Sequence, residues 1–278
     1  KINNKLSTFY IPLATTEGAL IASINRGMKL ISRAGGATTI HKNNGMSRAP
    51  VFKTKNLEQS IELEKFVEDN FEELKKITES TSNHLVLKKT QVFINGRSVW
   101  VRFVYDTQDA MGMNMVGKAT DIAVTFILSK VNVKLVALSG NVCVDKKPSQ
   151  LNNILGRGRS VQAEVFITKD ILQEVMQCDI DTFCEVGLRK NYQGSIVSGS
   201  SGFNSQTANI ISAIFLATGQ DIAHTVDASS AITNVERDGD GIYFSINIPN
   251  LNIGTIGGGT SLTAQNELLN LTLKSIDN

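Results

Sequence analysis

The sequence predicts an α+β protein in which a large mixed α/β domain, residues 1–48 and 139–278, contains an inserted small α+β domain, residues 49–138. Two observations predict this division. Within the insertion, a helix, a hairpin, a second helix and a strand follow one another, which is enough for a compact domain. On both sides of it, short strands alternate with helices, and we read these flanks as one domain that the insertion interrupts.

The inserted domain begins with a predicted amphipathic helix from about Leu57 to Ile77, because apolar residues recur there near helical spacing with Glu and Lys between them. Residues 91–94 and 99–104 are strand-like, and Asn95-Gly96 between them is a strong hairpin turn signal. The apolar residues 119–128 predict a second helix, and residues 131–138 predict a buried strand.

The large domain is predicted from both ends of the chain. Residues 1–48 are rich in loops and glycine pairs, although the small and apolar residues after Glu17 suggest a closely packed helix. Beyond Gly140, residues 161–167 and 241–248 have the character of strands, and residues 207–218 that of an apolar helix.

Composition indicates a folded globular protein. The chain has 278 residues, of which 41% are hydrophobic and 19% charged, values that argue against disorder. Lys plus Arg is 28 and Asp plus Glu is 26, so the net charge is only +2. A general nucleic-acid-binding protein usually carries a basic excess, so we expect no nucleic-acid partner. Small anionic ligands remain compatible, because they need only a few placed cations.

Cysteine and histidine usage gives no sign of a metal site. The cysteines Cys143, Cys178 and Cys184 form no C-x-x-C pair, and the three histidines are scattered. This usage is natural for a reducing compartment, so we expect a cytoplasmic location. No apolar run is long enough to span a membrane, although an anchor outside these residues is compatible with the sequence.

Five short segments contain residues suited to chemistry, and each has an ordinary structural explanation when taken alone. Residues 139–148 contain Asp145, Lys146 and Lys147, which can serve two anionic groups but are also typical of a solvated loop. Glu17 can be a simple helix-start residue, favoured there by the helix dipole. Asp221, which follows the apolar helix that carries Asn209, lies against the helix dipole, and this is unfavourable unless it has a partner.

The other two segments are suited to a phosphate-bearing ligand. Residues 109–115 lie between a strand and a helix, where Asp109 can cap the helix and free N–H groups can face a phosphate. The segment is not a Rossmann G-x-G-x-x-G motif, and its methionines equally suit core packing. Residues 254–260 contain three consecutive glycines, which permit a close approach by a ligand or by another stretch of backbone.

Taken in order, the segments resemble one family. The strings TTEG, GMSRAP, DAMGMNMV, SGNVCVDKKP, ANII, TGQD and GTIGGGT occur with roughly the order and spacing of hydroxymethylglutaryl-coenzyme A (HMG-CoA) reductases. The resemblance covers essentially the whole chain, and the D-K-K-P loop and the methionine after the glycine of DAMGMN look like the class I enzymes. It implies a ferredoxin-like fold for the inserted domain, which would bind NADP(H), and substrate binding by the large domain.

The resemblance implies the reduction of (S)-3-hydroxy-3-methylglutaryl-CoA to mevalonate and free coenzyme A in two hydride transfers from NADPH, a step of isoprenoid biosynthesis. Lys146 matches the catalytic lysine that stabilises the developing oxyanion. Glu17 matches the catalytic acid, whose pKa we expect burial and a neighbouring acid to raise. Asp221 matches the aspartate that bonds both groups, and Asn209 matches the amide that orients the lysine.

Further residues match binding positions of the family. The resemblance places the substrate carboxylate against Arg48, Ser139, Asp145 and Lys147, and the coenzyme A phosphates near Ser23, Asn25 and Arg26. The implied cofactor site comprises Ser82, Asn83, Asp109, Met111, Gly112, Met113, Asn114 and Gly257.

The sequence departs from the family pattern in two respects. The family's histidine that protonates the leaving thiolate belongs to a segment beyond these residues, and His224 matches no catalytic position, so we interpret it as structural. Asn83 stands where animal enzymes have the arginine near the adenosine 2′-phosphate. Lys88, Lys89 or Arg97 are candidates to replace it, so NADPH is the expected cofactor and NADH stays possible.

The resemblance also implies a homodimer or a higher homo-oligomer whose active site is shared between subunits. Two other functions are compatible with this scaffold. One is a non-catalytic acyl-coenzyme A binding or regulatory protein. The combination of Glu17, Lys146 and Asp221 disfavours it, because binding alone needs no tuned acid beside a lysine. The other is a class II-like enzyme that works in the oxidative direction, which the D-K-K-P loop disfavours.

Overall fold

The structure is a computed structural model that describes residues 8–274. It divides into two compact units. The first contains the chain up to Lys42, Lys146–Leu251 and the residues from Gly258 on, and the second contains Asn43–Asp145 and Asn252–Gly257. The predicted insertion, residues 49–138, lies inside the second unit, to which residues on either side of it and the late segment 252–257 also belong. None of the described helices is both long and apolar enough to cross a lipid bilayer.

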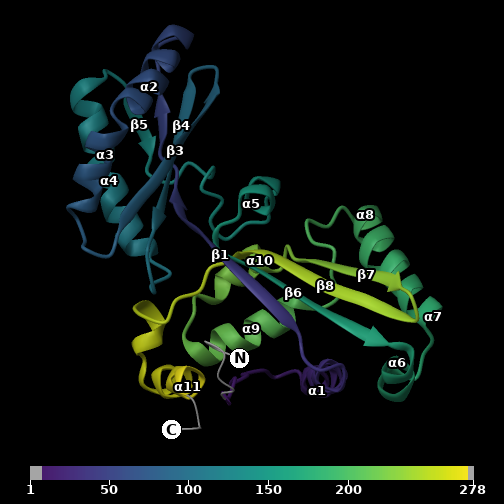
Figure 1. Ribbon diagram of the computed structural model, residues 1–278. Helices are drawn as coiled ribbons and strands as arrows, with labels where there is room; N and C mark the ends of the chain where they lie inside the picture. The colour runs from purple at the N-terminus through teal and green to yellow at the C-terminus, as the bar shows by residue number, and fades with distance from the viewer. Residues whose placement is uncertain (1–7, 275–278) are drawn as a thin grey trace. The chain divides into compact units, whose positions relative to one another are not determined.

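The second unit is built on a four-stranded antiparallel sheet (Figure 1). Its elements, with β1 entering from the first unit, are β1 (Thr38–Arg48), β2 (Val51–Lys53), α2 (Leu57–Asp69), α3 (Phe71–Glu79), β3 (Val86–Asn95), β4 (Ser98–Asp106), α4 (Met113–Lys130) and β5 (Lys134–Ala137). The end of β1 and all of β2 pair in succession with β4, so they act as one interrupted strand. The spatial order is therefore β5, β1/β2, β4, β3, which is the ferredoxin-like arrangement.

Helices α2, α3 and α4 cover one face of this sheet (Figure 1). Their apolar residues form one core with the strands, including Leu63 of α2, Leu74 of α3 and Phe103 of β4, all fully buried. The predicted hairpin is present, with Asn95 paired to Ser98 and Gly96 at a φ of 58°. The core of this unit therefore forms from the predicted amphipathic segments, and its hairpin has the predicted turn.

One predicted helix of the second unit is in fact two. The helix expected from Leu57 to Ile77 breaks at Asn70, whose φ of −107° and ψ of 23° are not helical. The Asn70 side chain donates to the carbonyl of Phe66 at 2.9 Å. Asparagine readily makes such local bonds to the backbone, so it ends α2 and allows α3 to start in a new direction.

The first unit contains the remaining elements, which pack around the sheet of β1, β6, β8 and β7. They are α1 (Gly18–Arg33), α5 (Gln150–Leu155), β6 (Gly158–Thr168), α6 (Lys169–Met176), α7 (Ile180–Val186), the π-helix η1 (Gly187–Gly194), α8 (Ser195–Ser198), α9 (Thr207–Thr218), the 3-10 helix η2 (Ile222–His224), α10 (Thr225–Ala228), β7 (Ile232–Asp238), β8 (Gly241–Leu251), the 3-10 helix η3 (Gly258–Ser261) and α11 (Thr263–Leu273). Residues 8–48 are more regular than predicted, because α1 and β1 occupy most of them and the glycine pair Gly35-Gly36 supplies only the turn between them.

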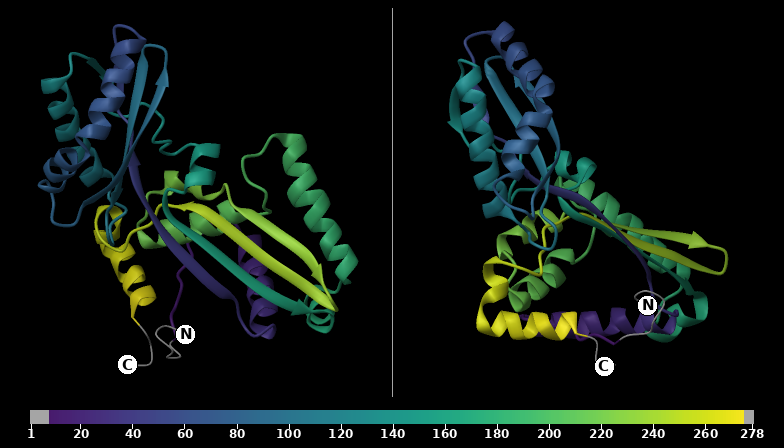
Figure 2. Two further views of the ribbon diagram at one scale, coloured as in Figure 1. Left: turned by 45° about the horizontal axis from the view of Figure 1, so that its top comes forward. Right: turned by 60° about the vertical axis from the view of Figure 1, so that its left-hand side comes forward.

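The core of the first unit lies between its sheet and helices α1, α6 and α7. Val165 and Ile167 of β6 and Ile242 of β8 pack there with Leu30 of α1 and Leu172 of α6. Helices α7, η1 and α8 continue one another alongside β7 (Figure 2).

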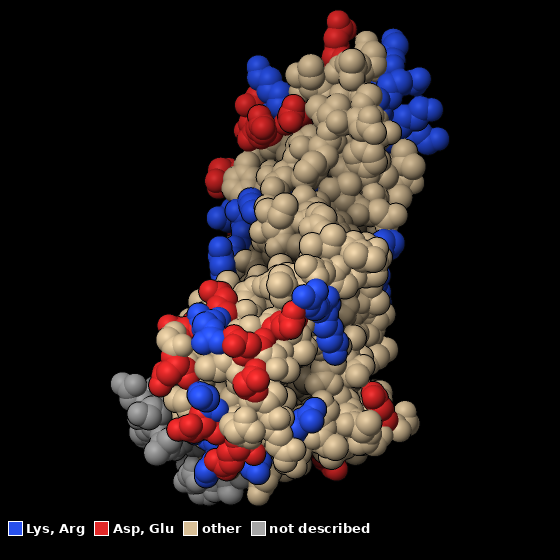
Figure 3. All heavy atoms as spheres, turned by 90° about the vertical axis from the view of Figure 1, so that its right-hand side faces the viewer, with Lys and Arg blue, Asp and Glu red and all other residues tan. Residues whose placement is uncertain are grey.

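On the face drawn in Figure 3, acidic and basic side chains lie interspersed, in keeping with the near balance of charge in the sequence.

A close backbone contact fixes the C-terminal end of α9. Gly219 follows this helix with a φ of 71°, and a Cβ atom there would lie 2.2 Å from the carbonyl oxygen of Gly259. Only glycine permits both the left-handed conformation and this approach. The end of α9 is thereby held against η3, and Asp221 follows two residues later.

Candidate active site

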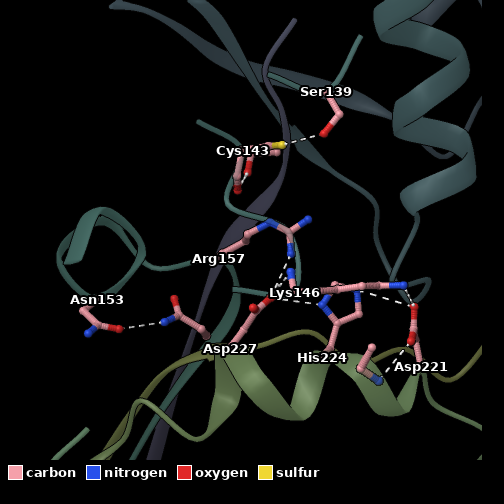
Figure 4. A network of polar contacts seen from close by, with 11 residues as sticks. Ser139, Cys143, Lys146, Asn153, Arg157, Asp221, His224 and Asp227 are labelled. Carbon is pink, nitrogen blue, oxygen red and sulfur yellow. Dashed lines mark hydrogen bonds and ion pairs between the residues drawn. The ribbon is translucent and has the colours of Figure 1, made fainter. Parts of the chain in front are cut away.

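The centre of the site is an ion pair between Lys146 and Asp221. The Lys146 Nζ atom lies 2.7 Å from Oδ2 of Asp221, and both side chains are partly exposed, at 43% and 33% (Figure 4). Asp221 is not the end of a helix, as the sequence suggested, but the N-cap of η2, where its Oδ1 accepts the amide of Ala223 at 3.2 Å. The partner that the sequence analysis required for this aspartate is therefore Lys146.

Several contacts act on the protonation of Asp221. Burial raises its pKa, but the hydrogen bond from Lys146, the charge of His224 and the amide of Ala223 lower it more. The pKa of Asp221 therefore lies below its ordinary value, and the carboxylate stays ionised to more acidic pH than in an unfolded chain.

The loop that carries Lys146 has an unusual backbone. Asn141, Val144 and Lys146 have φ values of 67°, 48° and 59°, in the left-handed region that side-chain-bearing residues rarely adopt. For a β-branched residue such as Val144 this conformation is especially unfavourable. Each such residue costs about 1–3 kcal/mol and is typical of functional sites, where the surrounding contacts hold the backbone in place.

The start of this loop is tied to the second unit. The amide of Gly140 donates to the carbonyl of Ala49 at 2.7 Å, and the Trp100 indole donates to the carbonyl of Gly140 at 2.8 Å. The hydroxyl of Ser139 lies 3.2 Å from the sulfur of Cys143, and the hydroxyl of Ser47 donates to the carbonyl of Cys143 at 3.2 Å. Ser139 thus lies in a well-fixed turn.

Arg48, a predicted carboxylate ligand in the second unit, has one unsatisfied donor. Its side chain is partly buried, and its Nε atom is fully buried without a hydrogen-bond partner in residues 8–274. A buried guanidinium N–H without a partner is costly, so Arg48 is an unsatisfied part of this unit. Asp145 is also partly buried, and Lys147 in the first unit is exposed.

Behind Lys146, the first unit contains three fully buried ionisable residues, His224, Asp227 and Arg157 (Figure 4). Arg157 NH1 lies 3.2 Å from Oδ2 of Asp227, and His224 Nδ1 lies 3.0 Å from the same oxygen. The backbone amide of Lys146 also points to this oxygen, at 3.4 Å. The Lys146–Asp221 pair is therefore connected to a buried polar network.

Glu17 and Asn209 line a common hollow of about 660 Å³ in the first unit, with walls from the segment before α1 and from α9. Glu17 is the N-cap of α1, and its backbone amide is bound by the hydroxyl of Thr15 at 3.0 Å. The burial expected for Glu17 is absent, because its side chain stands at the open start of the helix and is exposed. Asn209 is also exposed, and within residues 8–274 its side chain makes no hydrogen bond to Lys146.

The predicted cofactor residues come together within the second unit. Helix α4 begins at Met113 after Gly112, whose φ of 87° is left-handed and which has no side chain to cap the helix. Asp109 is therefore not the cap that the sequence suggested, and its carbonyl accepts the amide of Thr255 at 2.8 Å. Segment 252–257 packs so closely here that a Cβ atom on Gly254 would lie 2.3 Å from the amide nitrogen of Met111. Ile256 also forms a β-bridge with Ala110, so the segment that ends at Gly257 runs along the stretch before α4.

A second part of the predicted cofactor site follows α3. The hydroxyl of Ser82 accepts the amide of His84 at 3.2 Å, and His84 Nδ1 lies 3.1 Å from Oε1 of Gln108. The turn that contains Asn83 is thus linked to the segment before α4. Lys88 is near the start of β3 and donates to the carbonyl of Asn43 at 2.8 Å. Arg97 lies in the hairpin turn at the opposite end of β3 from Asn83, and its Nε donates to the carbonyl of Thr54 at 3.1 Å.

Comparison with known proteins decides the family. The sequence profile described as hydroxymethylglutaryl-coenzyme A reductase matches residues 1–275. The chain belongs to this family. The family resemblance that the motifs predicted is thereby confirmed.

The HMG-CoA reductases of two archaea illustrate the similarity. The enzyme of Methanocaldococcus jannaschii is 49% identical, over 98% of this chain and 69% of its own length. That of Halobacterium salinarum is 44% identical, over 95% of this chain and 65% of its own length. The chain therefore spans about two thirds of the length of these relatives.

A solved HMG-CoA reductase has the same fold. The class II enzyme of Streptococcus pneumoniae, in a structure bound to NADPH in open conformations, superimposes with a TM-score of 0.71 over 97% of this chain and 78% of its own. At 17% identity this likeness concerns the fold alone. It agrees with the mixed α/β architecture that the sequence predicted.

The remaining predicted residues of this HMG-CoA reductase family member lie on α1. Ser23 exchanges hydrogen bonds with the side-chain amide of Gln206, at 2.9 and 3.3 Å, whereas Asn25 and Arg26 are exposed. The sequence analysis did not identify Arg157 or Asp227. Arg157 lies between two glycines, Gly156 and Gly158, whose φ values are positive in the structure, but this sequence does not by itself mark a buried charge.

Proposed function

We propose that this chain carries the active site of an HMG-CoA reductase that reduces (S)-3-hydroxy-3-methylglutaryl-CoA to mevalonate and coenzyme A with NADPH. The observation that supports this most strongly is the 2.7 Å pair of Lys146 and Asp221, in a chain of this family. An ammonium that a carboxylate holds at the end of a constrained loop is suited to stabilise a developing negative charge.

In this mechanism the thioester carbonyl lies against Lys146. When hydride reaches the carbonyl carbon, the oxygen gains negative charge, and the ammonium of Lys146 stabilises it. Asp221 keeps the lysine protonated and oriented, because its own pKa is lowered and it stays ionised. Glu17 supplies a proton to the same oxygen. Arg48 and Lys147 bind the free carboxylate of the substrate, with Ser139 and Asp145 beside it, and Asn209 orients the lysine once substrate has entered.

The residues around α4 fit a nicotinamide dinucleotide. The N-terminus of this 18-residue helix follows a glycine, and such a terminus attracts phosphate groups. A Cβ atom added to Gly257 would meet no atom within 4 Å, so the space beside this residue is open. Asp109, Met111, Met113 and Asn114 would hold the dinucleotide, with Ser82 and Asn83 near its adenosine end. When bound, NADPH supplies the hydride.

We propose that the protein is a homodimer or a higher homo-oligomer in which a second subunit covers Glu17. The exposure of Glu17 and the absence of a bond between Asn209 and Lys146 support this, because the proposed acid needs a less polar surrounding to hold a proton near neutral pH. Coenzyme A would then lie along α1, near Ser23, Asn25 and Arg26. A strictly monomeric, active enzyme in light scattering under assay conditions would contradict this assembly.

The reverse reaction separates the reductase from a protein that only binds acyl-coenzyme A. Mevalonate, coenzyme A and either NADP⁺ or NAD⁺ are mixed with full-length protein, and the absorbance of the reduced nicotinamide is followed. The reductase produces reduced cofactor only when both mevalonate and coenzyme A are present. A protein that binds coenzyme A but produces no reduced cofactor would contradict the proposal.

A further inference from the structure

His224 lies between two carboxylates and is itself fully buried. Its Nδ1 atom is within hydrogen-bond distance of Oδ2 of Asp227, at 3.0 Å, whereas its Nε2 atom is 3.8 Å from Oδ2 of Asp221, within ion-pair distance but too far for a hydrogen bond (Figure 4). The two nitrogens of an imidazole ring are on different edges, so one histidine can contact two acidic groups at once. The histidine is therefore placed to connect the active-site pair to the interior of the first unit.

The inner carboxylate has a fixed orientation. Asp227 is fully buried, and so is Arg157, whose NH1 lies 3.2 Å from the same oxygen that faces His224. A buried carboxylate next to a guanidinium is an acceptor, so the Nδ1 edge of His224 must donate to it. This contact fixes the plane of the imidazole ring and directs its Nε2 edge at Asp221. That edge donates to the Asp221 carboxylate only when both ring nitrogens carry a proton.

The same buried carboxylate also contacts the catalytic loop. Its Oδ2 atom faces the backbone amide of Lys146 at 3.4 Å, and Lys146 is one of the residues with a left-handed backbone. Lys146 is thus held at two points, at its backbone by Asp227 and at its ammonium by Asp221. His224 is the group that joins the two aspartates.

We propose that His224 is a positioning residue that, fixed by Asp227 and Arg157, holds the carboxylate of Asp221 in the orientation that places the Lys146 ammonium. This rests on the proposed function and adds to it a residue that the family motif does not assign. Groups behind a reacting side chain commonly set its orientation, and a misplacement of about 1 Å costs on the order of a hundredfold in rate. The competing explanation is that His224 only anchors Asp227 and serves the fold.

Two substitutions separate these explanations. The amide nitrogen of glutamine can occupy the place of the histidine Nε2, so His224→Gln keeps a donor toward Asp221 and loses the one toward Asp227. The amide nitrogen of asparagine is one bond closer to the backbone and can occupy the place of Nδ1, so His224→Asn does the opposite. Leu172→Ala leaves a cavity in the core of the first unit, away from Asp221 in the sequence. It serves as the control that lowers stability without changing His224.

The test measures kcat and KM of full-length variants. We expect His224→Asn to lower kcat by about ten- to a hundredfold, with KM changed less than about threefold. His224→Gln should keep more of the kcat, and Leu172→Ala should lower the melting temperature without lowering kcat. A kcat for His224→Asn equal to or above that of His224→Gln would overturn the proposal.

A thermal experiment tests the same contact without any assay of turnover. The melting temperatures of His224→Asn, Asp221→Asn and the double variant form a cycle. Because the two side chains lie within ion-pair distance, at 3.8 Å, their shifts should not add. Additive shifts would overturn the positioning role even in a fully active enzyme. Conversely, a wild-type protein without reductase activity would contradict the proposed function, and the thermal cycle would still decide the role of His224.

Discussion

The ammonium of Lys146 lies 2.7 Å from the carboxylate of Asp221, at the end of a loop whose backbone is held in an unfavourable conformation. This ion pair contributes little to the stability of the fold, because a partly exposed ion pair is worth about 1 kcal/mol or less. Three left-handed residues cost more than that. The loop is therefore shaped for the position of the lysine and not for stability.

Removal of the ammonium should slow the reaction strongly and leave the fold intact. Lys146→Ala is expected to lower kcat by about a hundred- to a thousandfold, the loss typical of one oxyanion-stabilising donor. Its melting temperature should stay close to that of the wild type. Lys190→Ala, an exposed lysine of η1, is the matched control and should keep full turnover. Near-normal turnover in Lys146→Ala would remove this lysine from the mechanism.

The lowered pKa of Asp221 predicts a pH-dependent contribution to stability. Because the pKa is lower in the folded state than in the unfolded chain, the contribution is fully present above the unfolded value. It is lost as the pH falls through the folded value. The difference in free energy of unfolding between wild type and Asp221→Asn should therefore be larger at neutral pH than in acid. Denaturant titrations at several pH values measure it, and a difference that grows toward acid would contradict the shift.

Elements that depend on neighbouring residues, such as tight turns and apolar helices, could be predicted from the sequence. The Asn95-Gly96 hairpin needs only its turn residues, and the apolar helix at 207–218 has the predicted bounds. The break at Asn70 was missed because the apolar periodicity continues across it, and only the bond to Phe66 identifies it. The family motifs supplied the site residues Lys146 and Asp221.

The buried network behind the site could not be predicted in the same way. Arg157 and Asp227 are 70 residues apart in the chain, and neither has a local pattern that marks it as buried. A single charged residue in a sequence is normally expected at the surface, because burial without a partner is so costly. Only the fold brings these two together. Likewise, the exposure of Glu17 could not be read from TTEG, since it depends on what packs over the start of α1.

Glu17 should be required for proton supply but not for folding. Glu17→Gln keeps the shape of the side chain and removes the transferable proton, so kcat near neutral pH should fall strongly, by about a hundredfold or more. The melting temperature should hardly change, because the side chain is exposed. Glu174→Gln, another exposed glutamate of the first unit, is the control. Full turnover of Glu17→Gln would show that another group is the acid.

Cofactor choice should show a modest preference for NADPH. The stretch from Ser80 to Lys89 offers hydroxyls and two lysines, but Lys88 is already bound to the carbonyl of Asn43 and Asn83 carries no charge. Flexible lysines select a 2′-phosphate less sharply than a fixed guanidinium. The ratio of kcat/KM for NADPH and NADH should rise in Asn83→Arg and fall in Lys89→Ala. A wild-type ratio that favours NADH would show that the lysines do not serve the phosphate.

The stoichiometry of the forward reaction tests the central claim most directly. Full-length protein is given HMG-CoA and NADPH, and the loss of nicotinamide absorbance and the release of free thiol are followed together. The account predicts that two NADPH are oxidised for each coenzyme A released, and that Lys146→Ala slows both processes by about a hundred- to a thousandfold. Thiol release without oxidation of NADPH, or no reaction of either kind, would contradict it.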